Sequence, residues 1–192
     1  MTELDDRRGR RYELQPLHDI ENQDIAYVAA LLEEARSRCV DLIVDMTDHA
    51  MWTRPSGTPF SAGDLVLHMN WAEYLWLPRI GPHRLSADTV AMIERGSVSR
   101  LYEPDSWTLP VPGLVKLCGQ TREQLMLPCL NAATALDQEV GSAMPDGRGP
   151  STVRQIMMHL ITSWIYHSGQ VGLLTLQNGL DYHWAFPQAA GR

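Results

Sequence analysis

The sequence predicts an all-α protein, a four-helix bundle with a long crossover between its second and third helices. Four long segments place apolar residues three or four positions apart, as amphipathic helices do. No stretch of useful length alternates between apolar and polar residues, as a half-buried strand would. The 192 residues, 44% of them hydrophobic, suffice for one domain with a sizeable core. We expect residues 1–17, which are rich in charge, to form a flexible arm and residues 18–192 to form a single domain.

The first two helices are expected on either side of a short loop. The first should run from about Ile20 to Asp48, and residues 50–60, rich in Pro, Gly, Ser and Thr, should then form a loop. Ser61, with Asp64 three residues later, resembles a capping box and predicts the start of the second helix. This helix should end at Pro78, because proline disfavours helical backbone in the residue before it.

The long crossover, residues 83–112, should contain a short helix from Ala87 to Arg95. The third long helix is expected from about Gly113 to Glu139. Pro128 lies inside it and should kink the helix or leave carbonyl groups unpaired near Gln124.

The fourth helix should begin at the capping box formed by Thr152 and Gln155. It should stop at Asn178 and Gly179, two residue types that tolerate left-handed backbone. The aromatic tail, residues 180–192, is expected to pack over one end of the bundle.

Composition argues against several classes of protein. The net charge is −7 and no basic stripe is present, so a nucleic-acid partner is not expected. No apolar run approaches the roughly 18 residues of a membrane span, and the N-terminus resembles no secretion signal. The three cysteines form no CxxC pair and lie in apolar helical stretches, which predicts free thiols in the reducing cytoplasm.

Three histidines are the main candidates for chemistry. His68 on the second helix and His167 on the fourth both fall on inward faces, so each is the other's expected partner. A divalent metal could satisfy both, because imidazole suits Zn and Ni. His159 lies two turns before His167, roughly 12 Å along the helix, which is too far for both to reach one ion. We therefore expect His159 to lie behind the ligands, to be a hydrogen-bonding group higher in the bundle, or to be a core residue.

Four aromatic residues near these histidines could line a substrate site: Trp71, Tyr74, Trp164 and Tyr166. They would supply apolar walls or hydroxyl donors to a small molecule. The alternative is that they only pack the core.

Two stretches, DLVLHMNWAEYLWL (64–77) and STVRQIMMHLITSWIYHSGQVGLL (151–174), resemble the DinB/YfiT-like superfamily of helical bundles. The stretch MWTRPSGTPFSAGDLVLH (51–68) is similar to its W…RP.G…S…H lead-in. The most similar members are mycothiol-dependent and include maleylpyruvate isomerase-like and S-transferase-like proteins. The resemblance covers about residues 20–180.

This resemblance implies an up-down-down-up bundle that holds a divalent ion, often Zn or Ni. By position the family's ligands would be His68, Ser163 and His167. The family usually has His or Glu where Ser163 stands, and a neutral hydroxyl is a poor ligand for these ions. The ion would lower the pKa of a low-molecular-weight thiol such as mycothiol. The resemblance also implies a possible homodimer.

Three functions are compatible with these residues. The first is a metal-dependent thiol S-transferase or isomerase that acts on a small molecule. The second, motivated by Ser163, is a metal-independent tailoring enzyme or cyclase with His68 and His167 as general acid and base. The third is a non-catalytic bundle that binds a small ligand at a degenerate metal site.

Overall fold

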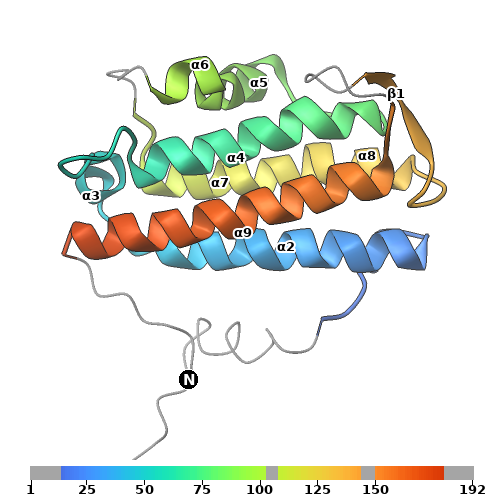
Figure 1. Ribbon diagram of the computed structural model, residues 1–192, viewed down its shortest axis with the longest axis horizontal. Coiled ribbons are helices and arrows are strands. Elements are labelled where there is room, and N and C mark those ends of the chain that lie inside the picture. The colour runs from blue at the N-terminus through green and yellow to red at the C-terminus, as the bar shows by residue number, and fades with distance from the viewer. Residues whose placement is uncertain (1–13, 103–107, 144–149, 180–192) are drawn as a thin grey trace, which may run out of the picture.

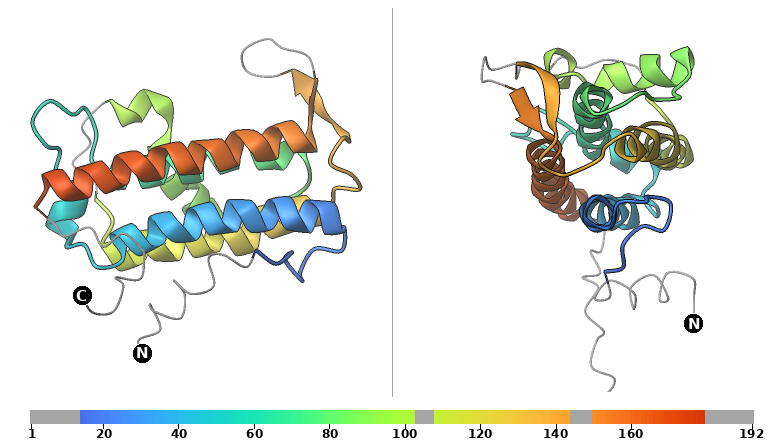
Figure 2. Two further views of the ribbon diagram at one scale, coloured as in Figure 1. Left: turned by 60° about the horizontal axis from the view of Figure 1, so that its bottom comes forward. Right: turned by 90° about the vertical axis from the view of Figure 1, so that its right-hand side faces the viewer.

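Four long helical segments lie side by side in the computed structural model, which describes residues 14–102, 108–143 and 150–179 (Figure 1). They are α2 (Gln23–Ile43), α4 (Ala62–Trp76), the continuous run α7 (Val111–Thr121), η4 (Arg122–Met126) and α8 (Leu127–Asn131), and α9 (Val153–Gln177). Helix α9 packs against α2 and α4, and α7 packs against the same two helices. The end-on view in Figure 2 shows the four segments grouped as a bundle, which confirms the predicted all-α class.

Helices α4 and α7–α8 run in the same direction, opposite to α2 and α9, as the colours of Figure 1 show. The implied up-down-down-up order is therefore confirmed. Because α4 and α7 are parallel, the chain must return the length of the bundle between them. This crossover contains η2 (Leu77–Arg79), α5 (Ala87–Ile93), η3 (Glu94–Gly96) and α6 (Val98–Leu101), of which α5, η3 and α6 pack on α4.

Both predicted capping boxes are present. The Ser61 hydroxyl accepts from the Asp64 N–H at 3.2 Å, and the Asp64 carboxylate accepts from the Ser61 N–H at 2.7 Å. Thr152 and Gln155 make the same reciprocal pair at 3.2 and 2.9 Å. These bonds satisfy N–H groups that have no partner within the helix, and they fix the starts of α4 and α9.

Pro128 disturbs its helix as predicted. Proline has no N–H to donate, and the preceding residues form the π-helical turn η4. The carbonyl of Gln124 instead accepts a 2.7 Å hydrogen bond from the Arg84 N–H in the crossover. The distortion thus joins the third helical segment to the connection that covers α4.

The predicted first and third helices are too long. The chain leaves α2 at Ile43, and Thr47 caps a separate short helix, α3 (Asp48–Trp52), which occupies the start of the expected loop. The third helical segment ends at Asn131, eight residues before the predicted end at Glu139.

A short ribbon of two strands was not predicted from the sequence. β1 (Glu139–Ala143) and β2 (Pro150–Thr152) pair antiparallel just before α9. Strands of five and three residues are too short to show alternation clearly, and they are stabilised by pairing with each other.

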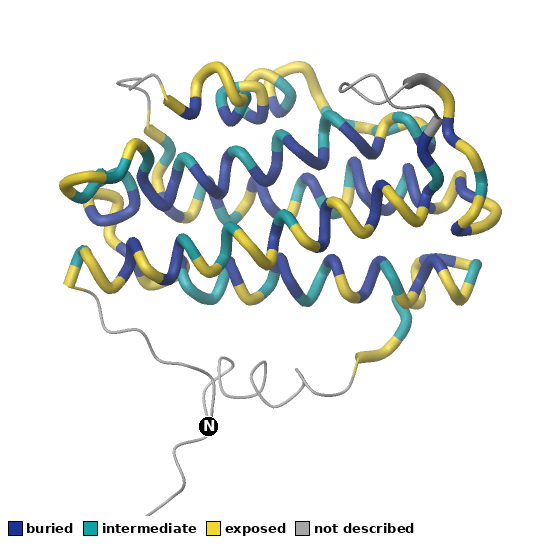
Figure 3. The backbone as a smooth tube through the Cα atoms, in the orientation of Figure 1, coloured by how far each residue is buried: buried dark blue, intermediate teal, exposed yellow. Residues whose placement is uncertain are grey.

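The core lies between the four helices, where their inward faces are buried (Figure 3). All three cysteines are free and buried there, as expected. Within the described ranges, no helix combines the length and apolarity needed to span a membrane. Residues 1–13 of the expected arm and residues 180–192 of the expected tail lie outside the described residues.

Candidate functional site

The structure brings His68 of α4 and His167 of α9 together across the contact between these two helices. Their ring centroids are 5.3 Å apart, and the rings meet edge to face at 86°. Both side chains are half-buried. The turn η3 packs on α4 over His68.

Each imidazole is held through its Nδ1 atom. His68 Nδ1 lies 3.0 Å from the carbonyl oxygen of Gly96, and His167 Nδ1 lies 2.6 Å from Oε1 of Gln170. Because these oxygens can only accept, each Nδ1 carries the proton and each Nε2 keeps its lone pair. Among the described residues, no hydrogen bond occupies either Nε2. Two basic nitrogens are therefore available at one site, on rings whose orientation is fixed.

Burial keeps both imidazoles neutral. Desolvation lowers the pKa of His68, the hydrogen bond to Gly96 raises it in part, and the nearby His167 lowers it further. Desolvation also lowers the pKa of His167, against a smaller opposing effect of Gln170. A neutral imidazole can accept a proton or bind a metal at pH 7, and a protonated one can do neither.

Gly96 is the residue that allows η3 to reach His68. A Cβ atom at Gly96 would lie 2.2 Å from the carbonyl oxygen of Leu67 and 2.7 Å from the backbone nitrogen of His68. No side chain fits in that space. Glycine therefore lets η3 approach the α4 backbone closely enough for the Gly96 carbonyl to accept the hydrogen bond from His68 Nδ1. Neither Gly96 nor Gln170 was identified from the sequence.

Ser163 lies one turn before His167 on α9 and is half-buried. Within the part of the chain that the structure describes, no three His, Cys, Asp or Glu side chains gather as a metal site would require. The donors present are thus the two histidine Nε2 atoms. This set fits a weakly held ion with several open positions better than a closed structural site.

His159 lies apart from the pair. Its ring packs against Trp76 with centroids 5.1 Å apart, and the guanidinium of Arg79 lies 4.4 Å from the centre of the same indole. The expected separation of His159 from His167 by two helical turns agrees with these contacts. Its placement behind a set of metal ligands stays a prediction.

The four predicted substrate-contact residues have different surroundings. Trp71 stacks on His68 at 5.6 Å, and the exposed Tyr166 ring lies 5.1 Å from His167. Tyr74 meets His83 instead, at 5.8 Å. Trp164 is buried, and its Nε1 donates to Glu73 at 2.6 Å. Trp71 and Tyr166 therefore flank the histidine pair, while Trp164 lies in the core.

An open groove of about 470 Å³ lies between α2 and α7. Glu33, Arg36, Cys118, Gly119 and Arg122 are among the residues that line it. It is on the side of the bundle opposite the contact between α4 and α9, so it is separate from the histidine pair.

The mycothiol S-transferase family model matches residues 27–175. The chain belongs to this family. The matched span contains both histidines and the residues that hold their Nδ1 atoms, and it confirms the DinB/YfiT-like resemblance. Among curated proteins, the search found no match.

Proposed function

We propose that this member of the mycothiol S-transferase family joins a low-molecular-weight thiol of the mycothiol class to a small electrophile. His68 and His167 would activate the thiol. One observation supports the proposal above the others: two neutral imidazoles meet edge to face, each with Nδ1 in a hydrogen bond and Nε2 free of one among the described residues. Family membership supports the choice of thiol.

The chemistry assigned to the histidines is proton transfer. The free Nε2 of one imidazole takes the thiol proton, and the resulting thiolate forms a bond to the electrophilic carbon. The bond to the leaving group breaks, and the imidazolium returns its proton to that group. Trp71 and Tyr166 flank the pair and would contact the organic parts of the two reactants.

The same residues would hold Zn or Ni, with His68 Nε2 and His167 Nε2 as its protein ligands. With the ion bound, neither Nε2 would be free to accept the thiol proton, so this is an alternative to direct proton transfer. Such an ion would supply Lewis acidity that lowers the pKa of the thiol. The hydrogen bonds on Nδ1 favour this role, because metal-binding histidines usually donate their other N–H to an oxygen.

A metal-independent reaction is the second candidate. Ser163 favours it, together with the lack of a three-ligand cluster among the described residues. His68 and His167 would then act as general acid and base in a tailoring, cyclisation or isomerisation step on a small molecule.

Metal analysis of untagged protein, with assays before and after chelation, separates the two candidates. If activity disappears with the chelator and returns with Zn or Ni, the metal-dependent reaction holds. Activity that is indifferent to the chelator but lost in His68→Ala and His167→Ala supports the second. Thiol transfer that persists in both variants rejects the proposed role of the pair.

A homodimer formed through the outer face of α9 is a further part of the proposal. Met158, Ile165, Leu173 and Leu176 are half or more exposed along this face, and the helix carries no Asp, Glu, Lys or Arg after Arg154. Depletion of charge with exposed apolar side chains is typical of an interface. If the two α9 helices pack antiparallel, Ile165 of each copy would meet Gly169 of the other. A Cβ atom at Gly169 would have no neighbour within 4 Å, so there is space for the isoleucine side chain.

Sedimentation analysis tests this dimer. The full chain should sediment as a dimer and Ile165→Glu as a monomer. Leu31→Glu, at an exposed apolar position on α2, is the control and should remain dimeric. A wild-type monomer at micromolar concentration contradicts the proposed dimer.

A further inference from the structure

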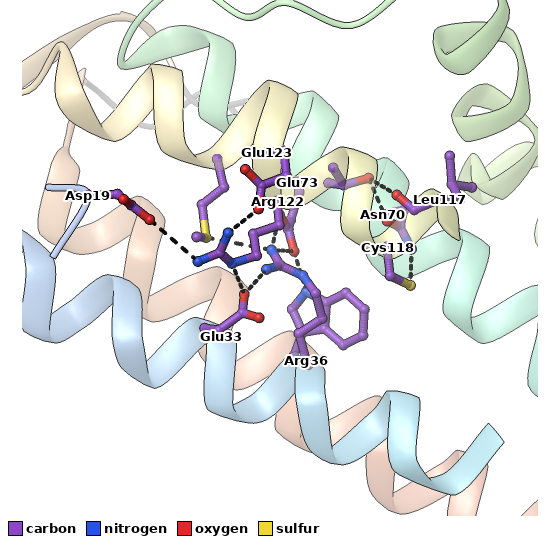
Figure 4. Close-up of polar contacts among 12 residues, drawn as sticks. Asp19, Glu33, Arg36, Asn70, Glu73, Leu117, Cys118, Arg122 and Glu123 are labelled. Atoms are coloured by element: carbon purple, nitrogen blue, oxygen red, sulfur yellow. Dashed lines mark hydrogen bonds and ion pairs between the residues drawn. The ribbon is translucent and has the colours of Figure 1, made fainter. Parts of the chain in front are cut away.

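The buried carboxylate of Glu73 on α4 joins three helices. It accepts hydrogen bonds of 2.7 and 2.6 Å from the guanidinium of Arg36 on α2. It also accepts the 2.6 Å bond from Nε1 of Trp164 on α9. All three residues are at most 2% exposed. Figure 4 shows Arg36 and Glu73 in contact within this cluster.

The bond between Glu73 and Trp164 crosses the same helix contact as the histidine pair. Glu73 follows His68 by five residues and Trp164 precedes His167 by three. Because α4 and α9 are antiparallel, both steps lead the same way along the bundle. At 1.5 Å per residue, the bond lies roughly 4.5–7.5 Å from the pair along the bundle axis, about one helical turn.

A role in the axial alignment of α4 and α9 explains this buried polar cluster better than a contribution to the stability of the fold does. Desolvation of a buried ion pair costs about as much as the attraction returns, and apolar replacements often stabilise as well. Hydrophobic attraction between α4 and α9 is not directional, so it fixes their axial alignment less strictly than a directional bond does. A short hydrogen bond from an indole to a carboxylate weakens steeply when the two groups are displaced.

We propose that Glu73 and Trp164 are positioning residues that set the spacing between His68 and His167. Arg36 balances the charge of Glu73 and allows the carboxylate to be buried. The functional meaning of this spacing rests on the proposed role of the histidine pair, but the spacing itself can be measured without any reaction.

The first test compares two identical substitutions. Trp164→Phe removes the N–H that Glu73 accepts, and Trp76→Phe removes an indole N–H that makes no hydrogen bond to the described residues. The readout is the nuclear Overhauser effect between the ring protons of His68 and His167 in metal-free, thiol-free protein. Trp76→Phe should keep the wild-type intensity, and Trp164→Phe should lose most of it. Full intensity in folded Trp164→Phe overturns the proposal.

A second pair of variants tests the same hydrogen bond if Trp164→Phe does not fold. Arg36→Met/Glu73→Gln removes both charges but keeps an oxygen that accepts the indole N–H. Arg36→Met/Glu73→Leu removes the charges and the acceptor. The ring-to-ring signal should survive in the first and fall severalfold in the second. Equal signals in the two double variants overturn the proposal, and neither result depends on whether the protein transfers thiols.

Discussion

At the scale of single residues, the main feature is two imidazoles whose orientation is fixed in the same way, by a hydrogen bond from Nδ1. Each donates its Nδ1 proton to an oxygen, from Gly96 or from Gln170, and each leaves Nε2 free. These hydrogen bonds need no charged partner, and burial outweighs their opposing effect on the two pKa values and keeps both rings neutral. This arrangement serves a proton acceptor and a metal ligand equally well, so Ser163 becomes the residue that decides between these roles.

Ser163→His should convert the pair into a three-histidine site. Position 163 lies one turn before His167, a spacing that lets two side chains of one helix reach the same ion. We expect the affinity for Zn²⁺, measured by competition with a chromogenic chelator, to rise on the order of tenfold or more. Thr162→His, at the neighbouring exposed position, should not raise it. Equal affinities of both variants would show that Ser163 does not face the pair.

The sequence predicted His68 and His167 because both lie on inward faces of amphipathic helices. It could not predict what holds them. Gly96 is distant from His68 in sequence, and its role depends on a backbone contact that no periodicity reveals. Glu73 was missed because a carboxylate on an apolar helix face gains its partners, Arg36 and Trp164, only from other helices.

At the scale of elements, the crossover does more than connect α4 with α7. Its 3₁₀ turn η3 lies on α4 through Gly96, and its Arg84 N–H pairs the carbonyl that Pro128 leaves free. The sequence predicted the short helix and the effect of Pro128. Their meeting could not be predicted, since it depends on the path of the crossover over α4.

Gly96→Ala should displace η3 and weaken the hydrogen bond to His68 Nδ1, because the added methyl group would overlap the α4 backbone. We expect kcat/KM to fall by roughly tenfold or more, the usual cost of losing a group that orients a functional histidine. Gly119→Ala is the matched control. Its added methyl meets nothing within 4 Å, and the variant should keep full activity. If both variants keep wild-type kcat/KM, the Gly96 carbonyl does not orient His68.

At the scale of the whole molecule, four helices place a polar pair at one contact and a groove at the opposite one. Helix periodicity and capping boxes predicted this bundle well. The β1–β2 ribbon and the early end of α8 were missed, because short segments are fixed by tertiary contacts rather than by pattern.

Stability should decrease as the solution becomes acidic. Burial lowers the pKa of His68, His159 and His167 in the folded protein, whereas a histidine in the unfolded chain has a pKa of about 6.5. At pH values between the folded and the unfolded histidine pKa, the unfolded chain binds more protons than the folded one. The free energy of unfolding therefore rises with pH and levels off above about 6.5. Denaturant titrations from pH 5 to 8 check this. A slope unchanged in His68→Ala/His167→Ala would contradict the contribution of the pair.

The rate of thiol conjugation is the direct test of whether His68 and His167 activate the thiol. Purified wild type, His68→Ala, His167→Ala and the double variant would be assayed with mycothiol and a chromogenic aryl halide. We expect conjugation well above the uncatalysed rate for the wild type and near-background rates for each single variant. The double variant should be no worse than either single one, because residues that act as a unit are not additive. Wild-type rates in the histidine variants would contradict the assignment of this pair as the thiol-activating site.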